Sequence, residues 1–499
     1  MATQNTFISL ENISKSFPGV RALDNVSLML NRGEVHCLAG QNGCGKSTLI
    51  KVISGVYQPD KGSHISVDGK RFPRLTPALS SYYGVQVIYQ DLSLFPNLTV
   101  MENIAIHRLL PGGDLLVNRR AMRELAQETM ARIGVQLDPL RKVETLSIAD
   151  RQLVAICRAL AAKASLVIMD EPTASLTRHE VNGLLRVVNE LKTAGICVVF
   201  VSHKLDEVME VSDRISVIRD GKLVGTWQAS ELDSDELAFL MTGQRFSFSH
   251  LPQRDDGNET PLLEVRSLSR RNEYQNINLE VRRGEIVSIV GLLGAGRTEL
   301  CLSLFGITRP DSGELIVDGQ PVKLRNNRDA IRHGIAYVSE DRQSEGLIMP
   351  QSIFDNLLVS IFGRLRNRLG LLDSRKAQET ASELIRELNI KVSDSQLPVQ
   401  TLSGGNAQRV AIGKWVATQP KVLILDSPTV GVDIANKEGI YRIARQLAES
   451  GMAVLMICDE IPEAWYNSHR VLVMRKGELV ASFAPHQCRE EDIAGVVNE

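Results

Sequence analysis

The stretch from Gly40 to Thr48 has the residue types and spacing of a phosphate-binding loop. It follows an apolar run at 34–39 and precedes another at 49–53. Glycines let the backbone close around a phosphate, and N–H groups at a helix start point toward the anion. We expect Lys46 to reach the β- and γ-phosphates and Ser47 to ligate Mg²⁺. The stretch therefore predicts a nucleoside triphosphate site made of Gly40, Gln41, Asn42, Gly43, Cys44, Gly45, Lys46, Ser47 and Thr48.

Other polar residues stand directly after apolar runs and could complete a hydrolytic site. Asp170 and Glu171 follow the run at 166–169. Asp170 is expected to hold Mg²⁺ through water, and Glu171 to orient or deprotonate the attacking water. An acidic pair also suits a helix N-cap, but the phosphate-binding loop upstream favours hydrolysis. His203 stands where a γ-phosphate sensor would lie, and Gln90 ends a further β-branched run, which is weak evidence by itself.

Two residues keep open interpretations. Phe17 can stack on a nucleotide base, although a place in the hydrophobic core is nearly as well supported. Cys44 is either a small residue tolerated at a variable loop position or a thiol acidified by the helix N-terminus. The first interpretation of Cys44 is favoured.

The elements that would position these residues occur twice along the chain. The glycine loop at Gly40 recurs at Gly291, and the acidic segment at Asp170 recurs at Asp426, a period of about 250 residues that is domain-sized. We predict one domain at 1–245, a linker at 246–260 and a second domain at 261–499. Short β-branched runs alternate with amphipathic stretches such as 119–134 and 179–195, which indicates a parallel or mixed sheet covered by helices. A helical insert is predicted at about 91–160. The alternation of strands and helices, together with the repeated glycine loop, predicts an α/β fold with two tandem P-loop NTPase domains.

Composition narrows the possible classes of protein. The 499 residues exceed what one core usually supports, and a net charge of −2 gives no global basic field for nucleic acid. No apolar run approaches the roughly 18 residues that span a bilayer. The 7 cysteines lack C-x-x-C spacing, so neither a zinc site nor a disulfide framework is indicated. The amino terminus lacks the features of a secretory signal, and a cytosolic protein is expected.

The order of the Gly40 loop, Gln90, Leu146–Ser147, Asp170–Glu171 and His203 resembles that of the ATP-binding subunits of ABC transporters. The resemblance covers nearly the whole chain, twice. Fusion of the two halves, the opening from Phe17 to Leu23 and the Arg342 segment further resemble the bacterial importers of ribose, galactose and xylose. The resemblance implies ATP and Mg²⁺ as cofactors. It also implies a head-to-tail sandwich, in which a serine–glycine loop of one half covers ATP on the P-loop of the other.

The two halves differ at residues of the P-loop, the acidic segment and the covering loop. The second P-loop has Arg297 in place of lysine, and Ser427 stands in place of the glutamate after Asp426. Glu340 and Asp459 take the positions of Gln90 and His203. The covering loop is intact only in the second half, as Ser403, Gly404 and Gly405, whereas the first half has Ser147, Ile148 and Ala149. In a head-to-tail arrangement, one composite site receives all the competent groups, so we predict one hydrolytic site and one degenerate site.

The resulting hypothesis is the ATPase of an ABC importer for a sugar. It implies a transmembrane permease partner, a periplasmic substrate-binding protein, no nucleic acid, and a place at the cytoplasmic face of the bacterial inner membrane. The alternative is a soluble tandem ABC ATPase that acts on ribosomes or nucleic acid. Such proteins usually have a long charged linker and two competent sites, whereas this chain has a short linker and one altered site.

Overall fold

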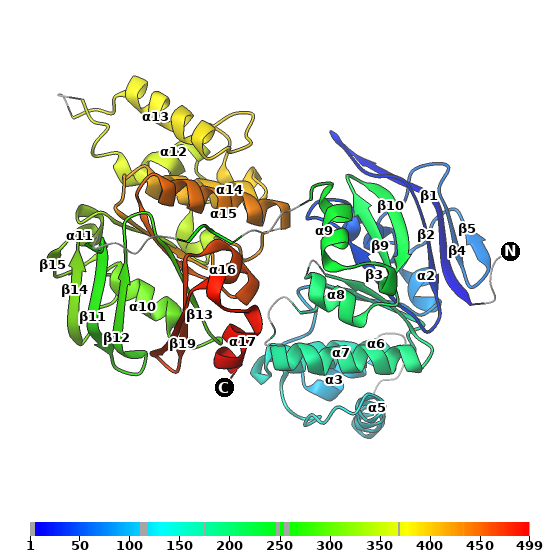
Figure 1. The fold of residues 1–499 in the computed structure, drawn as a ribbon. Coiled ribbons are helices and arrows are strands. Elements are labelled where there is room, and N and C mark those ends of the chain that lie inside the picture. Colours follow the sequence, from blue (N-terminus) through cyan, green and yellow to red (C-terminus); the bar gives the residue numbers. More distant parts are fainter. Residues whose placement is uncertain are drawn as a thin grey trace. The chain divides into compact units, whose positions relative to one another are not determined.

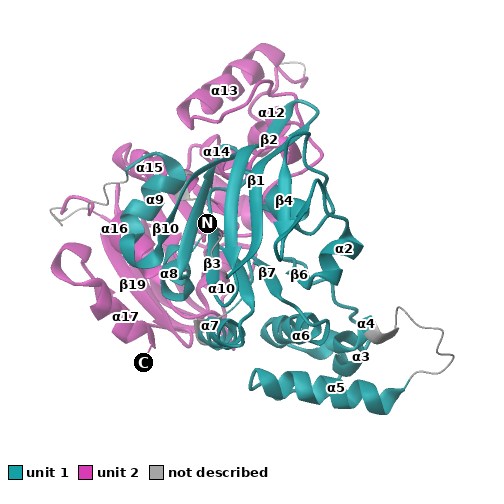
Figure 2. Ribbon diagram, turned by 90° about the vertical axis from the view of Figure 1, so that its right-hand side faces the viewer, with its two compact units in different colours: residues 1–246 teal, residues 247–499 magenta. Residues whose placement is uncertain are grey.

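The structure is a computed structural model that describes residues 5–109, 118–173, 176, 178–202, 204–245, 250–253, 260–367, 370–432 and 434–498. The chain divides into two compact units, Met1–Phe246 and Ser247–Glu499 (Figure 2). Both units repeat one order of elements, in which an apolar strand leads through a glycine loop into a helix. This architecture confirms the predicted α/β fold with two tandem P-loop domains.

The first unit is built on a six-stranded sheet of order β10-β9-β3-β8-β7-β6. The five neighbouring strands β6, β7, β8, β3 and β9 are parallel to one another, and β10 is antiparallel to β9. Strands β3 and β8 are buried at every residue, because short β-branched runs inside a parallel sheet are covered on both faces. The strands are β3 (Val35–Ala39), β6 (Val85–Ile88), β7 (Leu166–Asp170), β8 (Cys197–Val201), β9 (Arg214–Arg219) and β10 (Lys222–Gln228).

One face of this sheet packs against α1 (Lys46–Ile53) and a second, antiparallel sheet of order β2-β1-β4-β5. Its strands are β1 (Thr6–Phe17), β2 (Val20–Asn31), β4 (His64–Val67) and β5 (Lys70–Phe72). Strand β2 alternates buried and exposed residues, as expected of a sheet with one covered face.

The opposite face packs against helices, which lie together in Figure 1. These helices include α3 (Val100–Ile104), α5 (Arg119–Arg132), α6 (Ile148–Ala161) and α7 (Arg178–Thr193). Helices α5 and α7 confirm the amphipathic stretches predicted at 119–134 and 179–195, and α3, α5 and α6 form the predicted helical insert. The remaining helices of the unit are α2 (Pro77–Tyr82), α4 (Ile106–Leu109), α8 (Leu205–Val211) and α9 (Ser234–Thr242).

The second unit repeats this plan with a main sheet of order β16-β17-β18-β13-β19-β20 and an antiparallel sheet of order β12-β11-β14-β15. The strands are β11 (Leu263–Arg270), β12 (Tyr274–Val281), β13 (Ile286–Val290), β14 (Ser312–Val317), β15 (Gln320–Val322), β16 (Ile335–Val338), β17 (Val422–Asp426), β18 (Ala453–Ile457), β19 (Arg470–Arg475) and β20 (Glu478–Phe483). The helices are α10 (Arg297–Leu304), α11 (Asn327–Arg332), α12 (Ile353–Leu358), α13 (Ser374–Glu387), α14 (Gly404–Val416), α15 (Ile434–Glu449), α16 (Ile461–Asn467) and α17 (Glu490–Asn498). Strands β11 and β12 are shorter than β1 and β2, so the β1 tip that carries Phe17 has no counterpart.

Across the described ranges, no helix combines the length and the apolar character needed to cross a membrane.

Candidate functional site

The parallel strands of the first unit bring its predicted site segments to one edge of the sheet. Strands β3, β8, β7 and β6 are consecutive neighbours, and their carboxyl ends lead to Gly40, Ser202, Asp170 and Tyr89. Ligands of parallel α/β sheets bind outside this edge. The glycine loop, the acidic pair and Gln90 are therefore placed on the same side of the sheet. His203, which follows Ser202, lies outside the described residues.

Glycine is required in the first P-loop by close backbone packing. A Cβ on Gly40 would lie 2.3 Å from the Ile218 carbonyl oxygen, and a Cβ on Gly45 would lie 2.6 Å from that of Ala22. Gly45 also has a φ of 111° and caps α1, a conformation that side chains disfavour. The loop is thus held between the ends of two strands. Asn42 and Gly43 remain exposed in the loop, and Ser47 is exposed in the first turn of α1.

Lys46 folds over its own loop. Its Nζ donates hydrogen bonds to the carbonyl oxygens of Gly40 (2.6 Å) and Gln41 (2.8 Å), and the residue is only 7% exposed. Among the described residues, no carboxylate lies within ion-pair distance of this ammonium group. The first P-loop therefore presents a cation that is bonded to carbonyl oxygens and forms no ion pair with a described carboxylate, which suits it to an anionic ligand.

Cys44 is buried beneath the loop, with its Sγ 3.9 Å from the Lys46 Nζ. Burial raises the pKa of the thiol, and the nearby ammonium only partly opposes that effect. The alternative of an acidified thiol at Cys44 is therefore wrong. The thiol packs as a small apolar group, as the favoured interpretation predicts.

Asp170 and Glu171 stand together at the end of β7. Burial raises the pKa of Asp170, Glu171 raises it further, and the positive charges of Lys46 and Lys51 oppose the shift. Glu171 has a φ of 49° and donates its N–H to the Val201 carbonyl oxygen at 2.9 Å. Two adjacent carboxyl groups in a partly buried place favour a cation. Together with the hydroxyl of Ser47 they offer the hard oxygen ligands that fit Mg²⁺.

Gln90 and Phe17 are two further predicted site residues of the first unit. Gln90 is exposed in the segment that follows β6, where Leu92 and Ser93 have φ values of 58° and 45°. Arg158 of α6 holds that segment, since its guanidinium donates to the carbonyl oxygens of Leu92 and Ser93. Phe17 is half-buried at the end of β1, with its ring centroid 5.3 Å from that of Tyr57 in an edge-to-face pair. Phe17 therefore lies in neither of the hydrophobic cores of its unit.

In the second unit, Arg297 is arranged differently from Lys46. Its guanidinium donates to the Cys458 carbonyl oxygen at 2.8 Å and to Oδ1 of Asp459 at 3.1 Å. Both acceptors follow β18, so the side chain reaches toward the neighbouring strand rather than over its own loop. The cation of the second P-loop is consequently neutralised by a carboxylate of the same unit.

Asp426, the counterpart of Asp170, is completely buried and bonded through both carboxylate oxygens. Oδ1 accepts from the Thr298 hydroxyl at 3.3 Å, and Oδ2 accepts from the Tyr337 hydroxyl at 2.8 Å. Burial raises the pKa of Asp426 to about 6, although both hydrogen bonds oppose the shift. Sequence reasoning missed Tyr337. The sequence held one indication of its role. Tyr337 and Val87 are the third residues of the matching strands β16 and β6, so the second unit has a hydroxyl group where the first has an apolar side chain.

Two further groups of the second site depart from the first. Burial and the charge of Asp459 raise the pKa of Glu340, the residue that replaces Gln90. Ser427 adopts a φ of 43°, close to that of Glu171, and is buried. The backbone after the acidic strand is thus the same in both units, and only the side chain differs.

The serine–glycine loop of the second unit forms the start of α14. Ser403 caps the helix and accepts a hydrogen bond from the Asn406 side chain at 3.1 Å. A Cβ on Gly405 would lie 2.3 Å from Cγ of Asn436, so a larger residue does not fit. In the first unit the corresponding loop carries Ile148, which is 48% exposed.

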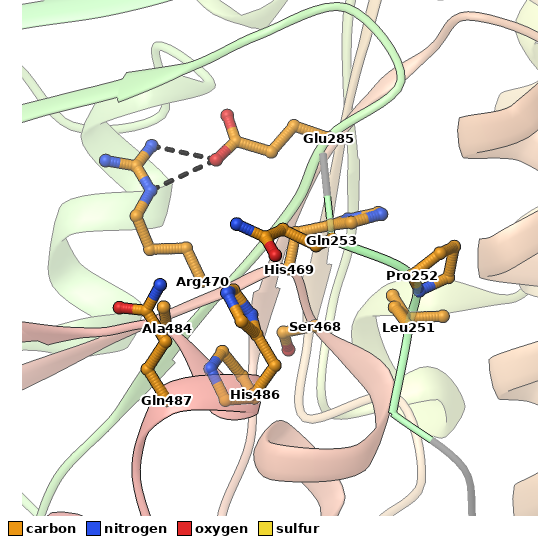
Figure 3. Close-up of a pocket in the computed structure, with 11 residues that line it drawn as sticks. Leu251, Pro252, Gln253, Glu285, Ser468, His469, Arg470, Ala484, His486 and Gln487 are labelled. Carbon is orange, nitrogen blue, oxygen red and sulfur yellow. Dashed lines mark hydrogen bonds and ion pairs between the residues drawn. The ribbon is translucent and has the colours of Figure 1, made fainter. Parts of the chain in front are cut away.

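A separate cavity of about 200 Å³ lies in the second unit and is lined in part by Leu251, Pro252 and Gln253 of the predicted linker (Figure 3). An ion pair between Glu285 and Arg470 lies beside it. Glu285 precedes β13, so this cavity is at the amino edge of the parallel strands, opposite the P-loop edge. It is therefore not part of the candidate nucleotide site. Linker residues 246–249 and 254–259 lie outside the described residues.

Comparisons with known proteins agree with this geometry. The family described as ABC transporter matches residues 23–174 and 274–430. A ribose import ATP-binding protein of Rubrobacter xylanophilus is 42% identical over 490 residues, which cover 98% of this chain and 97% of that protein. One from Bacillus cereus is 38% identical, covering 97% of this chain and 98% of that protein. The solved structure of an archaeal ribosome recycling factor in complex with a ribosomal stalk protein has the same fold, with a TM-score of 0.63 at 19% identity over 97% of this chain and 92% of that one. The chain therefore belongs to the ABC transporter family, as a transport ATPase with two ATP-binding cassettes in one polypeptide.

Proposed function

We propose that this chain is the ATP-hydrolysing subunit of a monosaccharide importer and that it powers uptake through a separate membrane permease. Relatives that match it over nearly their whole length are named ribose import ATP-binding proteins. An importer of this kind takes its sugar from a periplasmic substrate-binding protein. Its ATPase docks on the permease at the cytoplasmic face of the bacterial inner membrane. The proposed domains are 1–245 and 261–499, joined by a linker at 246–260.

The observation that carries the mechanism is the contrast between the two P-loop cations. No described carboxylate pairs with Lys46, whereas Arg297 is paired with Asp459. A triphosphate is strongly anionic, so it is attracted to the first loop and must displace or tolerate a carboxylate at the second. We therefore assign hydrolysis to the first P-loop and regard the second site as degenerate.

In the first site, Lys46 is assigned to the β- and γ-phosphates. Ser47, Asp170 and Gln90 supply oxygen ligands for Mg²⁺, which when bound would neutralise phosphate charge. Glu171 accepts the proton of the attacking water, because its carboxylate stands beside Asp170 at the sheet edge. His203 is assigned to the γ-phosphate and Phe17 to the adenine ring, both by their place in the chain.

The covering loop of this site is assigned to Ser403, Gly404 and Gly405 of the second unit. Tight packing behind Gly405 keeps the loop backbone bare, so that its N–H groups can approach a phosphate closely. In the second site, serine at 427 is no base at neutral pH, and loss of a general base typically costs about 10²–10⁴ in rate.

The alternative function, action on ribosomes or nucleic acid, receives no specific support. The similarity to the ribosome recycling factor is at 19% identity and shows the fold alone. The net charge of −2 offers no basic field for nucleic acid. Co-purification from membranes separates the two functions, because an importer ATPase should follow a permease and a ribosome-acting ATPase should follow ribosomes.

The catalytic assignment is tested by steady-state ATP hydrolysis of the full chain. Glu171→Gln should lower turnover by about 10²-fold or more, since it removes the proposed base. Ser427→Glu is the matched variant, because Ser427 and Glu171 share the same backbone conformation. It should leave turnover nearly unchanged, because the Arg297–Asp459 pair remains. Substantial activity in Glu171→Gln would rule the assignment out.

A further inference from the structure

Arg342 joins two segments of the second unit that are far apart in sequence. It begins the short helical segment η3 (Arg342–Gly346), which follows β16. Its Nη1 donates to the Val430 carbonyl oxygen at 2.9 Å, and its Nη2 donates to that of Gly431 at 3.3 Å. These two carbonyls belong to the loop after β17. The planar fork of arginine is suited to bridging two neighbouring acceptors in this way.

The same guanidinium lies against the covering loop. A Cβ on Gly404 would be 3.0 Å from Nη2 of Arg342 and 3.1 Å from the Gly431 carbonyl oxygen. The bare backbone of Gly404 is thus what allows η3, the loop at 430–431 and the start of α14 to meet. Lys414 of α14 also donates to the Gly346 carbonyl oxygen, so η3 is held at both of its ends.

The two units differ at the place of Arg342. The place of Arg342 in the first unit, four residues after the end of the matching strand, is taken by Leu92, which is buried and apolar. A cation of the following helix holds this segment in both units, at different carbonyl oxygens: Arg158 of α6 donates to those of Leu92 and Ser93, and Lys414 of α14 donates to that of Gly346. The side chain of Leu92 has no hydrogen-bond donor, so this place in the first unit cannot supply the bridge that Arg342 makes; residues 174–175, which match 430–431, lie outside the described residues.

We propose that Arg342 is a positioning residue for ATP hydrolysis. It holds the loop at 403–405 and the loop at 430–431 as one rigid surface, which closes over the triphosphate on the first P-loop. This inference rests on the composite site proposed above. Because the ATP-binding groups around Lys46 lie in the other unit, loss of the bridge slows turnover and leaves ATP affinity unchanged.

The test compares Arg342→Lys and Arg342→Leu in the full chain, with Lys414→Arg as the matched control. Lysine keeps the charge but cannot bridge two carbonyls, and leucine reproduces the first unit. We expect kcat to fall roughly ten- to a hundredfold in both variants, with the Kd for ATP within about twofold of the unaltered chain. Lys414→Arg should retain kcat, because the first unit holds the segment after β6 with an arginine of its own helix, Arg158. Thermal melting of each variant confirms that the second unit is folded.

Two results would overturn the proposal. One is a kcat within twofold of the unaltered chain in both Arg342 variants, and the other is a Kd that weakens in parallel with kcat. Ser403→Arg separates this failure from failure of the composite site. If Ser403→Arg abolishes turnover while the Arg342 variants are active, the composite site stands and the role of Arg342 is wrong. If Ser403→Arg leaves turnover intact, the composite site itself is wrong.

Discussion

Removal of the Asp459 charge should open the second P-loop to nucleotide. The perturbation is Asp459→Asn in a Lys46→Ala background, where the first P-loop has lost its phosphate-binding cation. Asn keeps the size of the side chain but cannot neutralise Arg297, whose guanidinium then becomes available to a phosphate.

The magnitude follows from the geometry of the ion pair. Nη2 of Arg297 lies 3.1 Å from Oδ1 of Asp459, and a phosphate oxygen bonded to the same guanidinium would lie within roughly 6 Å of that carboxylate. The Asp459 side chain is 42% exposed, so an effective dielectric constant between about 20 and 80 applies. The repulsion is then about 1–3 kcal/mol, and its removal should tighten nucleotide binding roughly 5- to 150-fold.

The assay is equilibrium dialysis of labelled ATP against the folded full chain, at fixed ionic strength because exposed charges are screened by salt. Asp318→Asn is the matched control, since it removes the same charge from an exposed turn of the second unit. An affinity unchanged by Asp459→Asn, or an equal gain in Asp318→Asn, would refute the reasoning.

Two further predictions concern buried groups. The pKa of Asp426 is raised from 3.8 to about 6, so the folded state binds this proton more tightly than the unfolded state, and its contribution to the free energy of unfolding is lost as pH rises from about 4 to 6. Asp426→Asn should therefore raise the free energy of unfolding of the second unit by roughly 3 kcal/mol at most at pH 7.5, and by much less at pH 4. Scanning calorimetry would detect this as a higher melting temperature at pH 7.5. An equal gain at both pH values would contradict the prediction. Cys44→Ala should retain ATP turnover, and maleimide should inactivate the unaltered chain only slowly at pH 7.5, because burial raises the pKa of the thiol. Rapid inactivation that ATP prevents would show instead that Cys44 is reactive.

Much of the fold could be predicted from the sequence because it depends on local patterns. Helices α5 and α7 follow from amphipathic spacing, and the buried parallel strands follow from short β-branched runs. Both P-loops follow from glycine spacing, because a tight turn into a helix has few backbone solutions. The unequal halves were also visible, since Arg297, Ser427 and Asp459 differ in residue type from their counterparts.

The partners of these side chains could not be predicted in the same way. Nothing near Arg297 in sequence indicates that its guanidinium reaches Asp459, or that the Tyr337 hydroxyl reaches Asp426. The bridge from Arg342 to Val430 and Gly431 likewise depends on strands and helices brought together by the sheet.

The fold class, the two P-loops and the differences in residue type between the two halves could be predicted from residue types and their spacing. Only the folded structure shows that Lys46 is bonded to carbonyl oxygens of its own loop, that Arg297 forms an ion pair with Asp459, and that burial raises the pKa of the Cys44 thiol. The physical reason is that backbone turns and strand patterns depend on neighbouring residues. The charge state and direction of a long side chain depend instead on burial and on acceptors that are distant in the chain.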